Sequence, residues 1–431
     1  MFDPERCLAL QDVTRIGFTI DGARPASVTN AFTLQLEQME YRWWLRQVRL
    51  MPKSRFDRWA FECCDVISQQ VMLAAPNAMG HMGNEVFVLA VTRYFGQPSY
   101  ISRSMEGLYF GKKGEQVDAH GNNLCCSNLP GGSFRILHDQ VKTLIITFFR
   151  LAGVEADDES ALWMLGKVRD PYMKRYIDAI LQARAQDKKN PEGTIIADIV
   201  ARDLPTEKQA SNDSGHGGRS DVIAEVKTMQ PGKCRYEKGN SQDNKPVDQR
   251  GKQVRKNYKD RTAKLDRKLA PEDAGTRTNG QVGPFEAALG EFYTENVFPI
   301  VVGAFGEVNE DANKLIKKLA RLTAKTDFGK SMSPLVSHSR KGGAFPIMQS
   351  QFRRALGCMI ARGQAQHLLK RRHYARPTAR EAYQTAEDNH SKHRSKPKAS
   401  MSGYARWWQN FIPEGYGLYQ QWRNGKNFGS L

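Results

Sequence analysis

The chain has 431 residues, 40% of them hydrophobic, which is enough apolar material for two or three packed units and excludes a wholly disordered protein. Its 64 Lys and Arg residues exceed its 46 Asp and Glu residues by 18, which favours a polyanionic partner, with nucleic acid as the default. No apolar run approaches the ~20 residues needed to span a bilayer, and the first residues lack the pattern of a secretory signal, so we expect no membrane partner.

The positive charge is concentrated in two segments. Residues 233–270 hold thirteen Lys and Arg against five Asp and Glu, and residues 353–403 hold twelve against three. Because local neutralisation of phosphates gives affinity for nucleic acid, this clustering favours binding. A basic helix can also be merely solvated, and that alternative stays open for each segment taken alone.

The seven cysteines do not form a disulfide framework. Their number is odd, and they include the adjacent pairs Cys63-Cys64 and Cys125-Cys126. Such usage is typical of a reducing compartment. We therefore expect a nuclear or cytoplasmic location.

Residues 1–135 are predicted to form a mostly helical unit. Apolar residues recur at the spacing of a buried helical face over 32–49, and further helices are predicted over 56–74 and 84–95. Glycines around residue 80 separate the last two helices.

Residues 136–375 alternate between helix and strand patterns. The predicted helices cover 136–152, 170–186, 247–269, 310–326 and 346–374, and the predicted strands cover 194–200, 221–229 and 298–305. The almost uninterrupted apolar run over 298–305 is typical of a strand buried on both faces of a mixed or parallel sheet. The predicted fold class is α/β, a mixed sheet flanked by helices, preceded by the helical unit.

The C-terminal region has two different compositions. Residues 376–403 are predicted to be a polar linker, because they contain too little apolar surface to pack. Residues 404–431 form an aromatic tail rich in Trp and Tyr. We expect this tail to dock onto a hydrophobic groove of its own or another chain, so that it offers a route to a protein partner; base stacking is the alternative.

Three residues in the middle of the chain have the chemistry of a metal-dependent hydrolytic site. Glu225 and Lys227 are two residues apart on a predicted strand, so their side chains emerge on one face. Asp198, on the preceding strand, can join them if the two strands pair. Two carboxylates suit Mg²⁺ or Mn²⁺, which can activate a water, while Lys227 orients the water or offsets charge on a phosphate. We therefore predict Asp198 and Glu225 as metal ligands and Lys227 as a catalytic residue.

Alternatives to this assignment remain. Asp221 also lies on the Glu225 face and is a rival catalytic carboxylate, but it is about 13 Å from Glu225 at a rise of ~3.3 Å per residue. Asp213, in a glycine-rich loop, is a third candidate. The charged residues could instead form an exposed cross-strand pattern in which Asp198 caps a turn. That interpretation is weakened by the strand around Glu225, which has no plainly solvated face.

The order of these elements, with Asp198 followed by Glu225-Val226-Lys227, resembles the core of the PD-(D/E)xK nucleases, the restriction-type endonucleases. Ala197 stands where that family usually has proline. The run Leu137-His138-Asp139-Gln140-Val141 is more particularly similar to the restriction-like endonuclease region of some non-LTR retroelement reverse transcriptase proteins. Further residues that carry the similarity are Arg250, Val254, Tyr258, Ala263, Leu265 and Asp266, with Gly303-Ala304-Phe305-Gly306-Glu307.

The resemblance covers roughly residues 136–375 and implies a metal-dependent endonuclease acting on DNA, of retroelement origin. The helix after the Glu225 strand would then grip phosphates through Arg250, Lys252, Gln253 and Lys256. RNA remains an alternative substrate. A protein of a different class is also compatible with the sequence, namely a non-catalytic nucleic-acid-binding protein with a degenerate nuclease fold.

Overall fold

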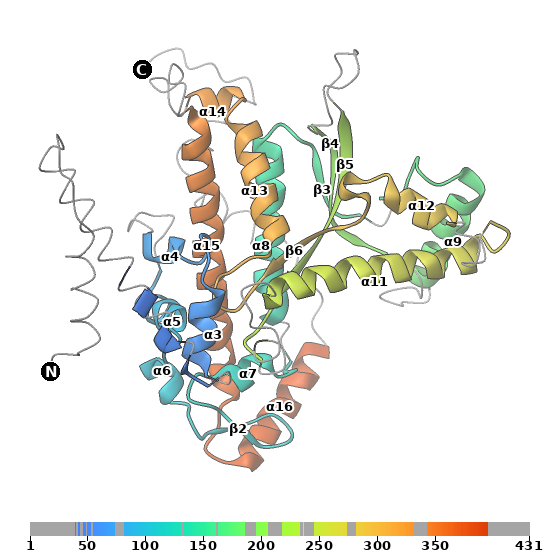
Figure 1. The fold of residues 1–431 in the computed structure, drawn as a ribbon. Helices are drawn as coiled ribbons and strands as arrows, with labels where there is room; N and C mark the ends of the chain where they lie inside the picture. The colour runs from blue at the N-terminus through green and yellow to red at the C-terminus, as the bar shows by residue number, and fades with distance from the viewer. Residues whose placement is uncertain are drawn as a thin grey trace, which may run out of the picture.

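Figure 1 presents a computed structural model of the chain. It describes residues 55–73, 82–130, 133–160, 163–185, 195–205, 218–232, 245–273, 282–331 and 343–394, with Tyr236 and scattered residues between 39 and 52. The aromatic tail, Asp213 and most of the helix predicted over 32–49 lie outside the described residues.

A four-stranded sheet lies at the centre of the molecule, in the order β3-β4-β5-β6. Its strands are β3 (Ala156–Ser160), β4 (Ala197–Pro205), β5 (Arg219–Thr228) and β6 (Phe298–Val302). The first three are antiparallel, whereas β6 runs parallel to β5. The predicted α/β class and the mixed sheet are therefore confirmed.

The strand boundaries differ from the predicted ones for local reasons. The sequence did not predict β3, because its residues Ala-Asp-Asp-Glu-Ser have low strand propensity; it is an edge strand that pairs only with β4. Strand β6 ends at Val302 rather than 305, since Gly303 begins a turn in which its N–H bonds to the Glu307 carbonyl at 2.8 Å.

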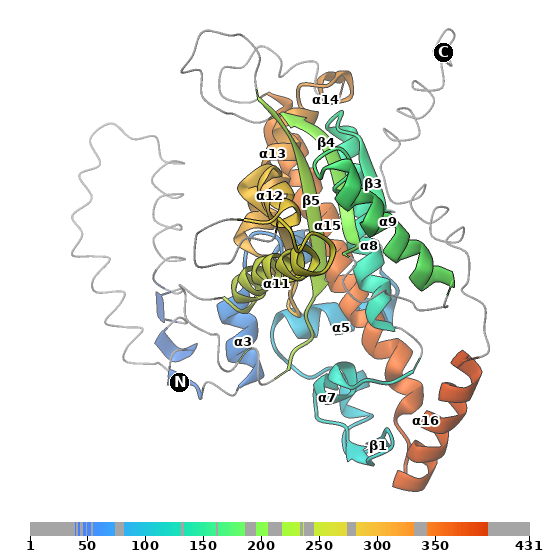
Figure 2. The same cartoon turned by 90° about the vertical axis from the view of Figure 1, so that its right-hand side faces the viewer.

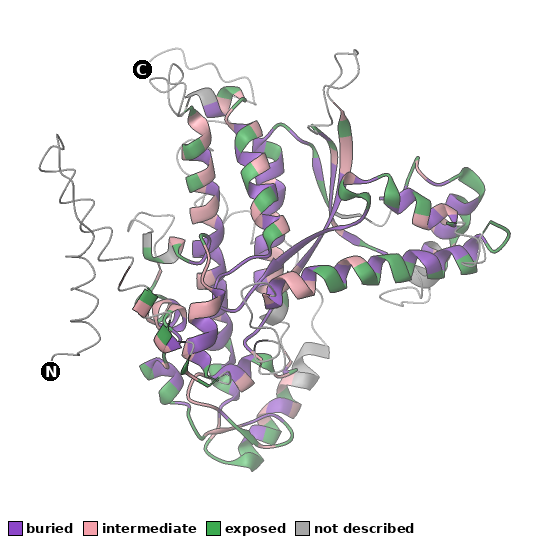
Figure 3. Cartoon of the chain, viewed as in Figure 1, coloured by how far each residue is buried: buried purple, intermediate pink, exposed green. Residues whose placement is uncertain are grey.

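Helices cover both faces of the sheet (Figures 1 and 2). On one face lie α8 (Ser133–Leu151), α13 (Glu310–Thr323) and α15 (Ala344–Arg371), and on the other α9 (Asp170–Ala185), α11 (Pro246–Leu269) and α12 (Pro284–Gly290). Strand residues alternate between the two cores, as their period of two requires: Ala224 packs toward α8, whereas Ile223 packs toward α11. Figure 3 shows the resulting buried strands between partly exposed helices.

The N-terminal region shares its cores with the sheet domain. Its elements are α3 (Phe56–Cys63), α4 (Gln70–Leu73), α5 (Asn84–Tyr94), α6 (Tyr100–Arg103), β1 (Tyr109–Phe110), β2 (Glu115–Gln116) and α7 (Asn122–Cys126). The helix predicted over 56–74 is broken where Asp65 Oδ1 accepts the N–H groups of Ile67 and Ser68, both at 2.8 Å. The C-terminal half of α15 packs on α5 and α7, so the predicted boundary at residue 135 does not separate two cores.

The segment predicted as a linker over 376–403 contains a helix, which corrects that prediction. After the short helix α14 (Asp327–Ser331), helix α15 and the 3-10 turn η3 (Arg372–Tyr374), helix α16 spans Ala379–Arg394. Tyr109 and Arg376 exchange backbone hydrogen bonds of 2.7 and 2.8 Å, and Ala382 and Ala386 are buried. Two small side chains four residues apart let the helix pack closely, although the segment is too polar for its composition to indicate it.

No helix in these described ranges is long and apolar enough to cross a membrane.

We expect a Gly283→Ala substitution to lower the thermal stability. A Cβ at this position would lie 2.3 Å from Cγ of the buried Asp266, whose carboxylate accepts the Phe285 N–H at 2.7 Å and the Glu286 N–H at 3.1 Å and so caps α12. Overpacking and loss of this cap should together cost about 2 kcal/mol, measured by thermal denaturation.

Gly290→Ala is the matched control on the same helix, because a Cβ there meets nothing within 4 Å. Equal losses of stability in the two variants would contradict the capping role of Asp266.

Candidate active site

The register of β4 and β5 brings two carboxylates together. Ile199 pairs with Ala224 and Val200 with Ile223, so continuing this register by one residue sets Asp198 opposite Glu225. Glu225 and Lys227 alternate with Ala224 and Val226 and so lie on the face covered by α11, while Asp198, at the start of β4, also reaches His138 of α8. This is the strand pairing on which the predicted cluster of Asp198, Glu225 and Lys227 depends.

Glu225 is buried, with both of its carboxylate oxygens engaged. Tyr258 of α11 donates its hydroxyl to Oε2 at 2.7 Å, and the ammonium of Lys227 pairs with Oε1. Burial raises the pKa of Glu225, and the negative charge of Asp198 raises it further. The effect of Asp198 on the pKa of Glu225 indicates that the two carboxylates lie near each other.

The pKa of Asp198 shifts in the opposite direction from that of Glu225. Its Oδ2 accepts the Val226 N–H at 2.8 Å and lies 3.2 Å from His138 Nε2. Burial would raise the pKa of Asp198, but the hydrogen bond and charge of His138, with the charge of Lys227, lower it below its usual value. No described residue hydrogen-bonds to Oδ1 of Asp198, which leaves this oxygen available as a ligand.

His138 connects the site to α8. Its Nδ1 lies 3.0 Å from Asp139 Oδ1, and its Nε2 faces Asp198. Burial opposes a charge on the ring, but the two carboxylates outweigh burial and raise the pKa of His138 to about 9. The imidazolium therefore donates to both carboxylates at neutral pH. Sequence reasoning noted the His138-Asp139 run without assigning it a role in the site.

The other candidate carboxylate, Asp221, belongs to the far end of β5. It pairs with Lys167 Nζ at 3.1 Å and accepts the backbone N–H of Asp203 at 3.2 Å. The structure thus places Asp221 in an ion pair of its own, away from the Asp198 cluster.

Helix α11 presents a basic surface beside the site. Lys252 and Lys256 are exposed on the side of α11 opposite Val254 and Tyr258, Gln253 is exposed between the two sides, and Arg250 is half-buried one turn before Val254. The spacing of the apolar residues predicted this placement of Lys252 and Lys256, whereas Arg250, predicted for another face, lies one turn from the buried Val254. Lys252 and Lys256 are therefore placed where a polyanion can reach them, on the side of α11 that faces away from Glu225.

Asp266 and Glu307, which contribute to the resemblance to the PD-(D/E)xK nucleases, bind neighbouring structural groups and do not join the Asp198 cluster. Asp266 caps α12, as described above. Glu307 is fully buried in the turn after β6, where it accepts the Tyr236 hydroxyl at 2.8 Å and the Phe305 N–H at 2.9 Å. Burial raises the pKa of Glu307 to about 7.

The donor set fits a hydrated cation with few protein ligands. Within the described ranges, no group of three or more His, Cys, Asp or Glu side chains could enclose a metal ion. Magnesium is often bound by one or two carboxylates with water and phosphate oxygens, for which Asp198 Oδ1 and Glu225 suffice. Since Lys227 neutralises Glu225 Oε1, a cation bound to that oxygen must displace the ammonium.

No protein-family profile matches this chain, and neither a curated protein nor a solved structure is detectably similar to it.

We expect the His138–Asp198 pair to make stability depend on pH. The folded-state pKa of about 9 lies above the unfolded value of ~6.5, so the stabilisation is fully present below pH ~6.5 and is lost as the pH rises to about 9. The loss should be on the order of 2 kcal/mol, measured by urea denaturation between pH 6 and pH 10.

A His138→Gln variant should lack this pH dependence, whereas His373→Gln, at an exposed histidine, should keep it. A wild-type stability that stays constant across this range would show that the imidazolium is not formed.

Proposed function

We propose that this protein is a metal-dependent endonuclease that hydrolyses phosphodiester bonds of DNA. The observation that carries the proposal is the cluster of Asp198, Glu225 and Lys227 at the start of β4 and the end of β5, where Tyr258 of α11 contacts Glu225. One acidic pair with an adjacent lysine supplies ligands, charge compensation and a group that can act on water.

The order of elements supports the proposed restriction-endonuclease-like fold. Helix α8 is followed by β3, β4 and β5, then by α11 and by β6, which runs parallel to β5. This is the order on which the resemblance to the PD-(D/E)xK nucleases depends, with β3 added. We also propose that the protein derives from a retroelement and acts in the nucleus or the cytoplasm.

Each side chain has a distinct task in this proposal. Asp198 and Glu225 would hold a magnesium or manganese ion, which when bound lowers the pKa of a water and offsets charge on the phosphate. Lys227, beside Glu225, would orient the water or stabilise the developing charge.

Two further residues position the carboxylates. The imidazolium of His138 keeps Asp198 ionised, and the hydroxyl of Tyr258 fixes Oε2 of Glu225. They act through the ligands rather than on the substrate.

One observation favours a second candidate, a nucleic-acid-binding protein without catalysis. Lys227 neutralises Glu225 and His138 neutralises Asp198, so the acidic pair is balanced by side chains of the protein itself. DNA or RNA would then bind along α11 without being cleaved.

Substitutions in the acidic pair should separate the two candidates. In a plasmid-nicking assay with Mg²⁺, Asp198→Asn and Glu225→Gln should each lower the cleavage rate at least 100-fold and weaken Mg²⁺ binding, because a charged ligand is lost. Lys227→Met should lower the rate while Mg²⁺ binding is kept or becomes tighter, because the ammonium no longer competes for Glu225 Oε1. DNA binding without metal should persist in all three variants.

Asp221→Asn is the matched control, since Asp221 is a carboxylate on the same strand with a partner of its own. Loss of nicking in this variant but not in Asp198→Asn would refute the proposed site. Absence of nicking in the wild-type protein, with DNA binding intact, would favour the second candidate.

We expect DNA affinity to depend on the basic face of α11. Each phosphate contact contributes about 0.9 to the slope of log K against log salt for duplex DNA. Changing Arg250, Lys252 and Lys256 together to Gln should flatten this slope by about 2 to 3 on unrelated sequences, as measured by fluorescence anisotropy.

Lys113→Gln, in the exposed turn between β1 and β2, should leave the slope unchanged. A weakening confined to one DNA sequence would instead indicate base readout by α11.

A further inference from the structure

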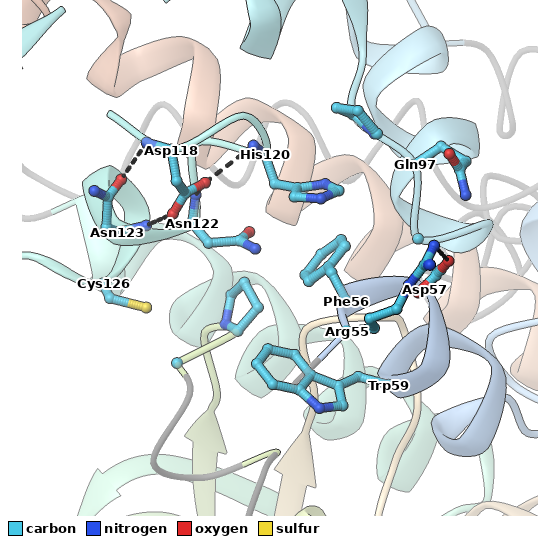
Figure 4. A pocket seen from close by; sticks show the side chains of 14 residues that line it. Arg55, Phe56, Asp57, Trp59, Gln97, Asp118, His120, Asn122, Asn123 and Cys126 are labelled. Atoms are coloured by element: carbon cyan, nitrogen blue, oxygen red, sulfur yellow. Dashed lines mark hydrogen bonds and ion pairs between the residues drawn. The ribbon is translucent and has the colours of Figure 1, made fainter. Parts of the chain in front are cut away.

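A pocket of about 570 Å³ lies outside the acidic site, between the N-terminal helices and the end of β5 (Figure 4). Its walls come from α3, from the loop after α5, from α7 and the loop before it, and from Pro231 and Gly232 after β5. Pockets of this size are typical of sites for small organic groups.

Aromatic rings form one side of this pocket. The rings of Phe56 and His120 lie with their centroids 4.3 Å apart, and Trp59 lies 6.1 Å from Phe56. Burial lowers the pKa of His120, so its ring is neutral at pH 7 and can act as a stacking surface. Phe, Trp and His rings are the side chains on which unstacked bases are commonly held.

A polar group points into the same space. Asn122 is 8% exposed, and its Oδ1 has no hydrogen-bond partner although it is buried. Figure 4 shows its carboxamide directed toward the ring of Phe56. An unsatisfied buried carbonyl is costly, and a carboxamide offers the donor and acceptor that can pair with the edge of a base.

The loop that carries His120 and leads into Asn122 is held in place by its own hydrogen bonds before any ligand binds. The carboxylate of Asp118 accepts the backbone N–H groups of His120, Asn122 and Asn123 at 3.0, 2.9 and 2.9 Å. A ligand therefore meets a formed site and pays little to order it.

The pocket is also close to the acidic site. Pro231 follows Lys227 by four residues, which is at most about 14 Å of extended chain. Phe56 and Trp59 pack in one cluster with Val247 in the first turn of α11, and Lys252 is about 8 Å further along that helix axis. A nucleic-acid strand that reaches the acidic site therefore passes close to the pocket and to the first turn of α11.

We propose that the pocket bounded by Phe56, His120 and Asn122 takes an unstacked nucleobase of the strand bound at the acidic site. This inference rests on the proposed function, because it assumes that a nucleic acid is held along α11. It adds a contact to an unpaired base near the scissile position.

The test compares two duplexes that differ only at one bulged nucleotide. One carries 2-aminopurine there and the other an abasic sugar, and both are titrated with the full-length protein in EDTA to prevent cleavage. The wild-type protein should bind the 2-aminopurine duplex about tenfold more tightly and quench the fluorescence of its base, since stacking on aromatic side chains is worth ~1–3 kcal/mol per base.

Two variants remove the stacking ring and the carboxamide separately. His120→Leu and Asn122→Ala should each reduce the preference for the base at least threefold and leave binding of the abasic duplex unchanged, with folding checked by circular dichroism. His120→Phe should keep the quenching. Tyr100→Ala is the matched control, because Tyr100 is an aromatic residue that is 63% exposed and does not line the pocket.

The comparison of the two duplexes tests the base-binding pocket, and binding of either duplex tests the nucleic-acid partner. Equal affinity of the wild-type protein for both duplexes would overturn the pocket while leaving binding along α11 intact. Binding of neither duplex would overturn the pocket together with the nucleic-acid partner. Saturable binding of free AMP, abolished by His120→Leu and without any preference between the duplexes, would assign the pocket to a free nucleotide and likewise overturn the inference. A base preference that persists when Mg²⁺-dependent nicking is absent would support the pocket and contradict only the catalytic proposal.

Discussion

The pairing of β4 with β5 is the constraint on which the candidate site depends. It sets Asp198 opposite Glu225 in a place where burial disfavours charge and the two carboxylates repel each other. Each is compensated from a different element, Asp198 by His138 of α8 and Glu225 by Lys227 of β5 and Tyr258 of α11. Because removing one partner would leave a buried charge unpaired, these charges tie α8, the sheet and α11 to one arrangement.

Sequence patterns predicted those parts of the structure that bury a periodic apolar face. The strands of the sheet and the helices that cover it were predicted because their buried residues recur every 3.6 residues in a helix and every two residues in a strand. The two-residue spacing of Glu225 and Lys227 likewise placed both side chains on one face. Strand β3 was missed because an acidic edge strand has no such face. His138 and Tyr258 were not assigned to the site because their contacts to Asp198 and Glu225 join residues 60 and 33 positions apart.

Composition predicted the domain boundaries less accurately than it predicted the individual helices and strands. Helix α15 has 28 residues, about 42 Å at 1.5 Å per residue, so its two halves belong to two different cores. Nothing in its composition marks the point where one core gives way to the next. Helix α16 packs through alanines whose burial depends on the neighbouring β1 hairpin, so a polar composition could not distinguish it from a linker.

Under the proposed function, the charge balance of the site couples metal binding to substrate binding. Without a cation, Lys227 already neutralises Glu225, so metal binding must overcome the loss of that ion pair. A phosphate that reached the acidic pair would change the balance, because its oxygens would serve as further ligands and would give the displaced ammonium of Lys227 a new anionic partner. The ion pair that stabilises the protein alone therefore disfavours the metal-loaded site until nucleic acid is bound, which would restrict hydrolysis to the complex.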